Sequence, residues 1–210
     1  GHTEIVAALI AAGAKVNQAS DNGSTPLSIA CLHGHTEIAT ALIAAGAEVN
    51  HRAGHGVTPL YIACQEGHTV TAAALLAAGA ALNQAAEDGA TPLFAACTHG
   101  HTETAAALLA AGAKVNQATD DGTMPLYIAC YNGHTEIASA LITAGAILIE
   151  ADDEGYTPLY IACFNGHTEL ATALIAAGAH LNQATKHEGT TPLFIACQNG
   201  HTETAAALLA

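Results

Sequence analysis

Six cysteines in this chain each stand four residues before a histidine, and this pairing is the first arrangement that could do chemistry. The pairs are Cys31/His35, Cys64/His68, Cys97/His101, Cys130/His134, Cys163/His167 and Cys197/His201. A thiolate and an imidazole at that spacing on one unbroken helix can hold a zinc ion. Here a glycine, such as Gly34, stands between the two and is expected to end the helix. We therefore expect no metal site and assign these residues to structural repeat positions.

The same cysteines could instead pair with one another. A disulfide needs two Cα atoms within about 7 Å of each other. Packed helices lie roughly 8–10 Å apart, so equivalent cysteines on neighbouring helices should be out of reach. Free cysteine is among the most commonly buried residues and packs as a small apolar side chain. We expect free, buried thiols.

Catalysis would need a set of complementary groups that stands apart from the repeating pattern. The sequence has no such Ser, His and Asp set, and no glycine-rich phosphate loop follows a strand. Acids cluster in two neighbouring turns, at Asp120 and Asp121 and again at Asp152, Asp153 and Glu154. A cluster of this kind is typical of a solvated face. We expect no enzyme activity and no cofactor.

The charge balance restricts the class of partner. The 210 residues include 18 acids and only four bases, Lys15, Arg52, Lys114 and Lys186, which gives a net charge of −14. Such a chain should repel nucleic acid and anionic membrane surfaces. No run reaches the roughly 18 apolar residues of a membrane span, so we expect no membrane insertion. The sequence does not indicate a compartment: free thiols suit the cytoplasm, and an extracellular location stays open.

A repeat positions all of these residues. A Gly-His pair returns at Gly1, Gly34, Gly67, Gly100, Gly133, Gly166 and Gly200, at steps of 33 residues with a final step of 34. Each interval also carries a TPL-type tripeptide, an Ala-Cys pair and an AAGA or TAGA turn. A fixed period of this length predicts a solenoid of stacked units, in which function belongs to a surface rather than to a central pocket.

One repeat can be interpreted as two short helices. Thr25 is an expected N-cap, and Pro26 fits the first helical turn, where its missing N–H has no partner to lose. The first helix should end at Gly34, and a second should run from about Thr36 to Ala45. Neither helix is long enough to be stable alone in water, so stacking must bury both.

The run GSTPLSIACLHGHTEIATALIAAGAEVN carries a resemblance to the ankyrin repeat, and the same pattern returns six times over the whole chain. The resemblance implies an all-α solenoid of stacked helix-turn-helix units joined by β-turn or hairpin-like loops. We interpret residues 1–210 as a single uncapped array of about six repeats and as a segment of a longer chain, with one inserted residue near 185–189.

Several repeats depart from the family pattern. The family's Thr is Met124 in one repeat, and its Asn is Ile149 in another. The histidine that follows T-P-L in the family is replaced by Ser28, Tyr61, Phe94, Tyr127, Tyr160 and Phe194. The hydrogen bonds that this histidine makes to the preceding turn must therefore be replaced or lost.

The resemblance also implies a concave groove for a protein partner, lined by turn tips and by the exposed ends of the first helices. The candidate partner-binding residues are Leu32, Val57, Tyr131, Asp152, Asp153, Glu154, Tyr156 and Phe164. Tyr131, Tyr156 and Phe164 are expected anchors, because exposed aromatic residues often dominate interfaces. The acids beside them would steer a basic partner. These aromatic residues could equally reflect repeat-to-repeat variation, packing on Tyr127 and Tyr160.

Two functions follow as hypotheses. The first is a non-enzymatic scaffold that binds another protein through the groove. The second is a structural array, compatible with an extracellular fibre, in which copies of the chain contact one another end to end. The second is favoured by outward positions of the second helices that are alanine or threonine instead of charged, such as Ala7, Thr40 and Ala73.

Overall fold

The computed structural model describes residues 2–210, which fall into two compact units with a boundary between Ala113 and Lys114. The α-helices of unit 1 are α1 (Thr3–Ala11), α2 (Pro26–Leu32), α3 (Thr36–Ala44), α4 (Pro59–Gln65), α5 (Thr69–Ala77), α6 (Pro92–Thr98) and α7 (Thr102–Ala110), with a 3-10 turn η1 (Gly54–Gly56). Those of unit 2 are α8 (Pro125–Tyr131), α9 (Thr135–Thr143), α10 (Pro158–Phe164), α11 (Thr168–Ala176), α12 (Pro192–Gln198) and α13 (Thr202–Leu209).

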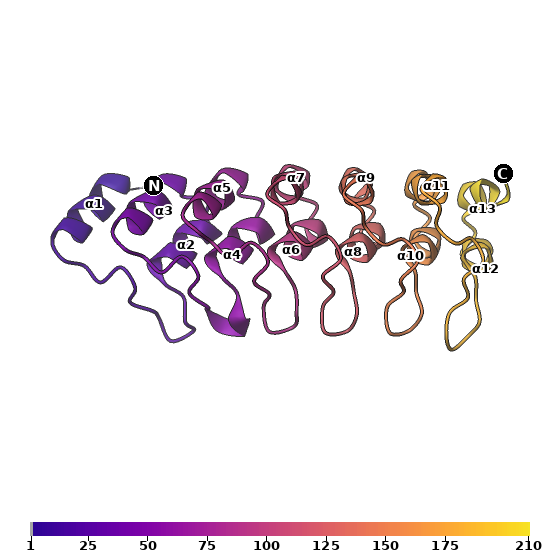
Figure 1. Ribbon diagram of the computed structural model, residues 1–210, viewed down its shortest axis with the longest axis horizontal. Coiled ribbons are helices and arrows are strands. Elements are labelled where there is room, and N and C mark those ends of the chain that lie inside the picture. Colours follow the sequence, from indigo (N-terminus) through magenta and orange to yellow (C-terminus); the bar gives the residue numbers. More distant parts are fainter. Residues whose placement is uncertain (1) are drawn as a thin grey trace. The chain divides into compact units, whose positions relative to one another are not determined.

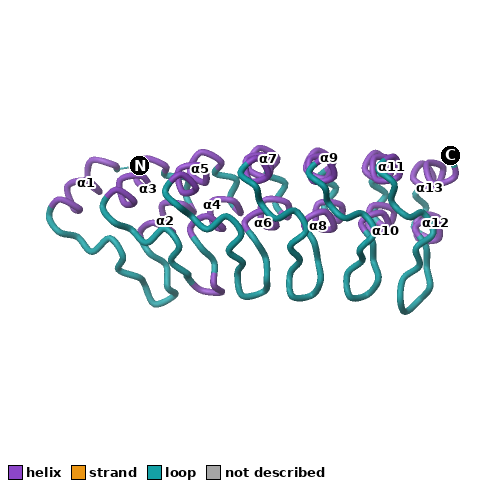
Figure 2. The backbone as a smooth tube through the Cα atoms, viewed as in Figure 1, coloured by secondary structure: helices purple, strands orange, loops and turns teal. Residues whose placement is uncertain are grey.

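Each unit is built from two rows of helices (Figure 1). In unit 1 the first helices α2, α4 and α6 pack in sequence, and so do the second helices α3, α5 and α7. In unit 2 the first helices are α8, α10 and α12, and the second helices are α9, α11 and α13. Residues 2–210 contain no strand, and a long loop precedes each first helix (Figure 2). This confirms the all-α solenoid predicted from the repeat.

The Thr-Pro dipeptides begin the first helices as predicted. Thr58 Oγ1 accepts a hydrogen bond from the Tyr61 N–H (3.2 Å), and Pro59 fills the first helical position. The same cap is made by Thr25, Thr91, Thr157 and Thr191. Met124 has no side-chain oxygen, so α8 begins without a cap of this kind.

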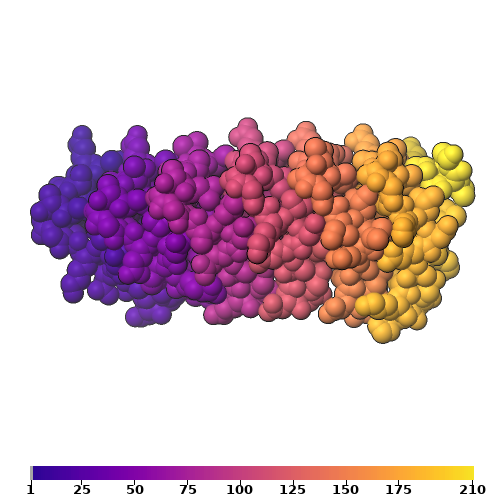
Figure 3. Space-filling model, in the orientation of Figure 1, coloured from indigo at the N-terminus to yellow at the C-terminus, as the bar shows by residue number. Residues whose placement is uncertain are grey.

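The core of each unit is a ladder of equivalent side chains. In the space-filling view, the atoms of successive repeats of each unit lie against one another (Figure 3). Leu27, Leu60, Leu93, Leu126 and Leu159 of the first helices and Leu42, Leu75, Leu108, Leu141 and Leu174 of the second helices are buried. Cys31, Cys64, Cys97, Cys130 and Cys163 are free and buried beside them. The prediction of burial is wrong for Cys197, which is exposed.

The Gly-His pairs connect each repeat to the one before it. His35, His68, His101, His134, His167 and His201 each stand at the N-cap of a second helix. Three of these imidazoles donate from Nε2 to the backbone carbonyl of the last residue of the first helix in the preceding repeat. The pairs are His68–Leu32 (3.2 Å), His101–Gln65 (2.8 Å) and His201–Phe164 (3.0 Å). A carbonyl that has no partner within its own helix is thereby satisfied by the next repeat.

Buried threonines add a second connection between repeats. Thr71 and Thr104 of the second helices are almost fully buried. Their hydroxyls share hydrogen bonds of 2.7 Å with Thr36 and Thr69 of the preceding repeat. The Thr204 and Thr168 hydroxyls make the same contact in unit 2. A hydroxyl can occupy this apolar site because its partner removes the penalty of an unpaired buried polar group.

The asparagine that closes each repeat makes a third connection. In unit 1, Asn50 Nδ2 donates to the Gly79 carbonyl (3.3 Å), and Asn50 Oδ1 accepts from the Ala81 N–H (2.7 Å). Asn116 of unit 2 bridges the turn at Gly145 and Ile147 in the same way. Ile149 stands at the next such position and carries no amide, so the equivalent groups of Gly178 and His180 receive no such bridge from it.

Restoring this bridge is expected to stabilise unit 2. Ile149 is 44% exposed, so replacing it buries no polar group and leaves no large cavity. Ile149→Asn should add two hydrogen bonds and raise the free energy of unfolding by about 1 kcal/mol, as measured by urea denaturation. Ile149→Asp is the matched control, because it can accept from the His180 N–H but cannot donate to the Gly178 carbonyl. Equal stability of the Asn variant and the parent would contradict the expectation.

The residues that replace the family's histidine after T-P-L form different bonds. Ser28 and Thr25 make a reciprocal capping box within their own repeat. Tyr127 and Tyr160 instead reach the next loop along the chain. The Tyr160 hydroxyl shares a hydrogen bond with Thr190 Oγ1 (3.0 Å), and Tyr127 bonds to the Asp152 carboxylate. At Tyr127 and Tyr160, the hydrogen bond that the family's histidine makes is thus replaced by a hydrogen bond to the next repeat.

The finger loops, which we define as residues 20–24, 53–57, 86–90, 119–123, 152–156 and 185–190, precede the first helices. Five of them close with an N–H to carbonyl bond between their first and fifth residues, as from Ser20 to Ser24 (3.0 Å). The last loop is one residue longer and closes from Thr185 to Thr190 (2.9 Å). Backbone bonds also join neighbouring loops, such as Lys186 N–H to the Glu154 carbonyl (3.2 Å) in unit 2.

Candidate functional site

The predicted groove residues are divided between the two units. Leu32 is the last residue of α2 and is exposed, and Val57 is the half-buried end of finger loop 53–57, both in unit 1. Unit 2 holds the remaining candidates, which are Tyr131, Asp152, Asp153, Glu154, Tyr156 and Phe164. The aromatic and acidic residues that motivated the prediction thus all belong to unit 2, and we describe the candidate site there.

Within unit 2 these residues lie at the two ends of α10. Tyr156 precedes α10 at the end of finger loop 152–156, whereas Phe164 is the last residue of that helix. A seven-residue helix is about 10 Å long, so the two rings cannot form one cluster. Tyr131 is the last residue of α8, which packs against α10. The candidate site therefore has an aromatic end at Tyr131 and Phe164, and a finger end at residues 152–156.

The aromatic end presents two large exposed rings. Tyr131 is 51% exposed and Phe164 is 43% exposed. Their backbone carbonyls are already bonded: Asn165 Nδ2 donates to the Tyr131 carbonyl (3.0 Å), and Asn199 Nδ2 donates to the Phe164 carbonyl (2.9 Å). Ligand recognition at this end would therefore use the ring faces more than the carbonyls that carry them.

At the finger end, Asp152 is used within the fold. Its Oδ1 accepts from the N–H groups of Glu154 (3.1 Å) and Tyr156 (2.9 Å) and so fixes the loop. Burial, the charge of Asp152 and its hydrogen bond raise the pKa of Tyr127. Tyr156 stacks on Tyr160 with ring centroids 5.1 Å apart, so one face of its ring is covered. The Asp152 carboxylate and one face of the Tyr156 ring are thus already occupied by contacts within unit 2.

The other two acids of this loop are exposed. The Glu154 carboxylate lies 3.2 Å from His187 Nε2 in the next finger loop. The Lys186 ammonium donates to the backbone carbonyl of Asp153 (2.9 Å), which leaves the Asp153 carboxylate outside that contact. The positive charge of Lys186 is balanced by Glu188 in the same loop, so the finger end keeps the negative charge of its own acids.

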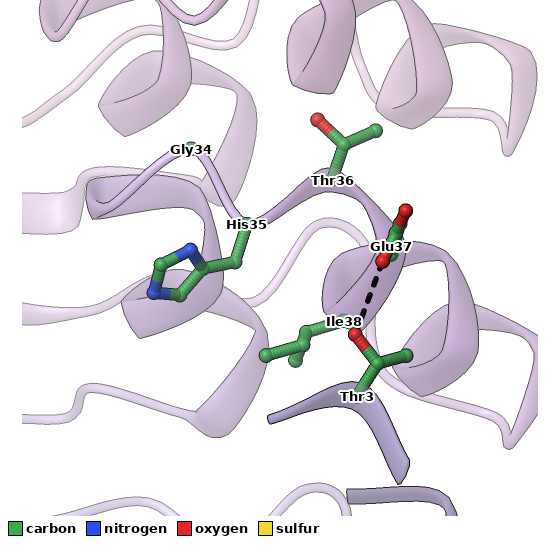
Figure 4. A pocket seen from close by; sticks show the side chains of 6 residues that line it. All are labelled: Thr3, Gly34, His35, Thr36, Glu37 and Ile38. Atoms are coloured by element: carbon green, nitrogen blue, oxygen red, sulfur yellow. Dashed lines mark hydrogen bonds between the residues drawn. The ribbon is translucent and has the colours of Figure 1, made fainter. Parts of the chain in front are cut away.

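Side chains that could ligate a metal are dispersed over the part of the chain that the structure describes. Among residues 2–210, no three His, Cys, Asp or Glu side chains gather closely enough to hold a metal ion. Figure 4 shows a pocket lined by Thr3, Gly34, His35, Thr36, Glu37 and Ile38, in which the Thr3 hydroxyl donates to Glu37 Oε2 (3.2 Å). That hydrogen bond links α1 to α3 and occupies one oxygen of the Glu37 carboxylate.

An apolar hollow in unit 1 was not anticipated from the sequence. It has a volume of about 690 Å³, and Leu9 of α1, Ile29 of α2 and Leu42 of α3 are among its lining residues. α1 has the sequence of a second helix, and its residues Val6, Leu9 and Ile10 line one side of the hollow. We assign no ligand to this hollow.

Two family models match the chain. One, described as "Ankyrin repeats (3 copies)", matches residues 1–53, 51–119 and 111–185, and another, described as "Ankyrin repeats (many copies)", matches residues 166–209. The chain belongs to the ankyrin-repeat family. Ankyrin repeats are generally protein-interaction modules, which agrees with a site that is a surface.

A solved ankyrin-repeat structure is similar over nearly the whole chain. The crystal structure of the human ASB11 ankyrin repeat domain matches with a TM-score of 0.87 and 31% sequence identity, covering 99% of this chain and 95% of that one. A comparison with curated proteins gave no match. In the part of the chain that the structure describes, no helix has the length and apolar character needed to cross a bilayer.

Proposed function

We propose that this ankyrin array is a non-enzymatic scaffold that binds a protein partner through the groove side of unit 2. The observation that carries the proposal is the pair of exposed rings at the ends of the packed helices α8 and α10. The equivalent positions of other repeats hold Leu32, Gln65, Thr98 and Gln198, so two neighbouring aromatic rings occur only in unit 2. Exposed aromatic residues on a rigid scaffold are typical anchors of interfaces.

The charge of the chain supports a protein partner over nucleic acid. A net charge of −14 opposes phosphate backbones, whereas acids at the finger end would attract a basic protein surface. Asp153 and Glu154 are exposed and suited to this steering role. Asp152 and Tyr156 would contribute by holding the finger loop in shape. In unit 1, Leu32 and Val57 are proposed as partner contacts of that unit by itself.

The test is a selection followed by substitution. Peptides selected from a random displayed library on the 210-residue chain should lose at least about 30-fold in affinity to Tyr131→Ala or Phe164→Ala, the effect expected of interface anchors. Val70→Ala is the matched control, because Val70 is a 70% exposed apolar residue of the second helix α5 and is not among the proposed contacts. Binding that survives both aromatic substitutions, or a selection without enriched peptides, would refute the proposal.

The alternative of a structural array that associates with copies of itself is supported by one observation. Outward residues of the second helices, such as Ala7, Thr40, Ala73 and Ala106, are exposed and uncharged, which protects a surface poorly against self-association. Sedimentation over a concentration series distinguishes the two functions. A constant monomer mass supports the scaffold, whereas mass that grows with concentration supports the fibre.

A further inference from the structure

The groove proposal leaves the chemistry of the anchoring group open, and the surroundings of Tyr131 and Phe164 restrict it. Neutral hydrogen-bonding groups gain little at this end, because both backbone carbonyls already accept bonds from Asn165 and Asn199. The exposed ring of Phe164 offers no hydrogen-bonding atom, and Tyr131 offers one hydroxyl. The ring faces are therefore the main contact surface, and they can take either an apolar group or a cation.

The charge of unit 2 favours the cation. From Lys114 to Ala210 the sequence has ten Asp and Glu residues and two Lys residues, a net charge of −8. The ammonium of Lys186 is directed to the Asp153 carbonyl in the finger loops, at the other end of α10 from Phe164. A cationic group from a partner would thus meet attractive charge in unit 2, which an apolar group would not use.

Hydration and shape of the cation favour arginine over lysine. Packed helices lie roughly 8–10 Å apart, so one long side chain can contact rings carried by both α8 and α10. The rings are about half exposed and cannot strip water from a strongly hydrated ammonium. A guanidinium is planar and more weakly hydrated, and it stacks on aromatic faces.

We infer that the anchor of the partner is an arginine side chain that stacks across Tyr131 and Phe164, on a segment that Asp153 and Glu154 help to attract. This inference rests on the proposed function and names the chemistry of its ligand. Tyr156 is outside the anchor site, because one of its faces is covered by Tyr160.

The test uses four peptide sublibraries that are identical except at one central position, which is arginine, lysine, leucine or citrulline, the neutral isostere of arginine. Binding of each to the 210-residue chain is measured by fluorescence anisotropy. The arginine sublibrary should bind about tenfold more tightly than the citrulline one, in keeping with cation–π contacts to two partly exposed rings. Its advantage should disappear in the double variant Tyr131→Leu, Phe164→Leu, which keeps apolar area and removes both rings.

The outcomes separate the inference from the proposed function. Stronger binding of the leucine sublibrary, or equal binding of lysine and arginine, would overturn the arginine anchor and leave the groove scaffold intact. An arginine advantage that persists in the double leucine variant would also overturn it, because the guanidinium would then be bound elsewhere. Failure of all four sublibraries to bind would count against the groove scaffold itself. Thermal denaturation of the double variant checks that it is folded.

Discussion

Raising the pH from 9 to 12 is expected to remove most of the stability of this protein, because its buried thiols cannot ionise in place. Burial raises the pKa of Cys31, Cys64, Cys97 and Cys163 from 9.0 to about 12, and raises that of Cys130 as well. The unfolded chain releases these protons near pH 9, whereas the folded chain retains them. Stability is therefore complete below pH 9 and is lost as the pH rises toward 12, at about 1.4 kcal/mol per pH unit for each thiol.

The variant that tests this expectation is Cys97→Ala. Between pH 7 and pH 10.5 it should lose about 2 kcal/mol less unfolding free energy than the parent, as measured by urea denaturation at both pH values. Cys97→Ser is the matched control: it should be less stable than the alanine variant at pH 7, yet show the same weaker pH dependence. Parallel losses in the parent and both variants would show that Cys97 has no role in alkaline unfolding.

Substitution of Gly67 by alanine is expected to cost about 3 kcal/mol of unfolding free energy. The residue has φ +73°, a left-handed conformation that costs a residue with a side chain about 1–2 kcal/mol. A Cβ atom there would also lie 2.5 Å from Nδ1 of His101. The imidazole would have to move, which breaks its 2.8 Å bond to the Gln65 carbonyl and adds about 1 kcal/mol.

Gly79→Ala separates the two contributions. Gly79 has φ +88°, but a Cβ atom there meets nothing within 4 Å, so only the backbone strain applies. The Gly67 variant should therefore be clearly less stable than the Gly79 variant in urea denaturation. Equal losses would mean that the contact between Gly67 and His101 contributes little to holding neighbouring repeats together.

Much of the fold follows from local sequence signals. Thr58-Pro59 begins a helix because the threonine oxygen and the proline ring each suit one position of a helix start, and the structure has this cap. Gly34 follows the end of α2 and has φ +66°, a left-handed conformation that does not continue a helix. These signals act within a few residues and repeat every 33, so a single sequence was enough to predict them.

The candidate site was less predictable because it depends on contacts between repeats. The sequence places Asp152 beside the aromatic residues, but only the folded loop shows that its carboxylate holds Tyr156 and Tyr127. Tyr156 and Phe164 are eight residues apart in one repeat, and their separation by the length of α10 becomes clear only once the helix bounds are known. Cys197 follows the cysteine pattern and is nevertheless exposed, because the local pattern alone does not determine burial.

Hydrogen–deuterium exchange of the chain with and without a selected peptide tests the central claim most directly, since it locates the binding surface without any substitution. The account predicts slower exchange at the ends of α8 and α10, near Tyr131 and Phe164, and in finger loop 152–156, with the second helices α9 and α11 unchanged. Protection confined to the second helices or to unit 1 would contradict recognition through the groove side of unit 2.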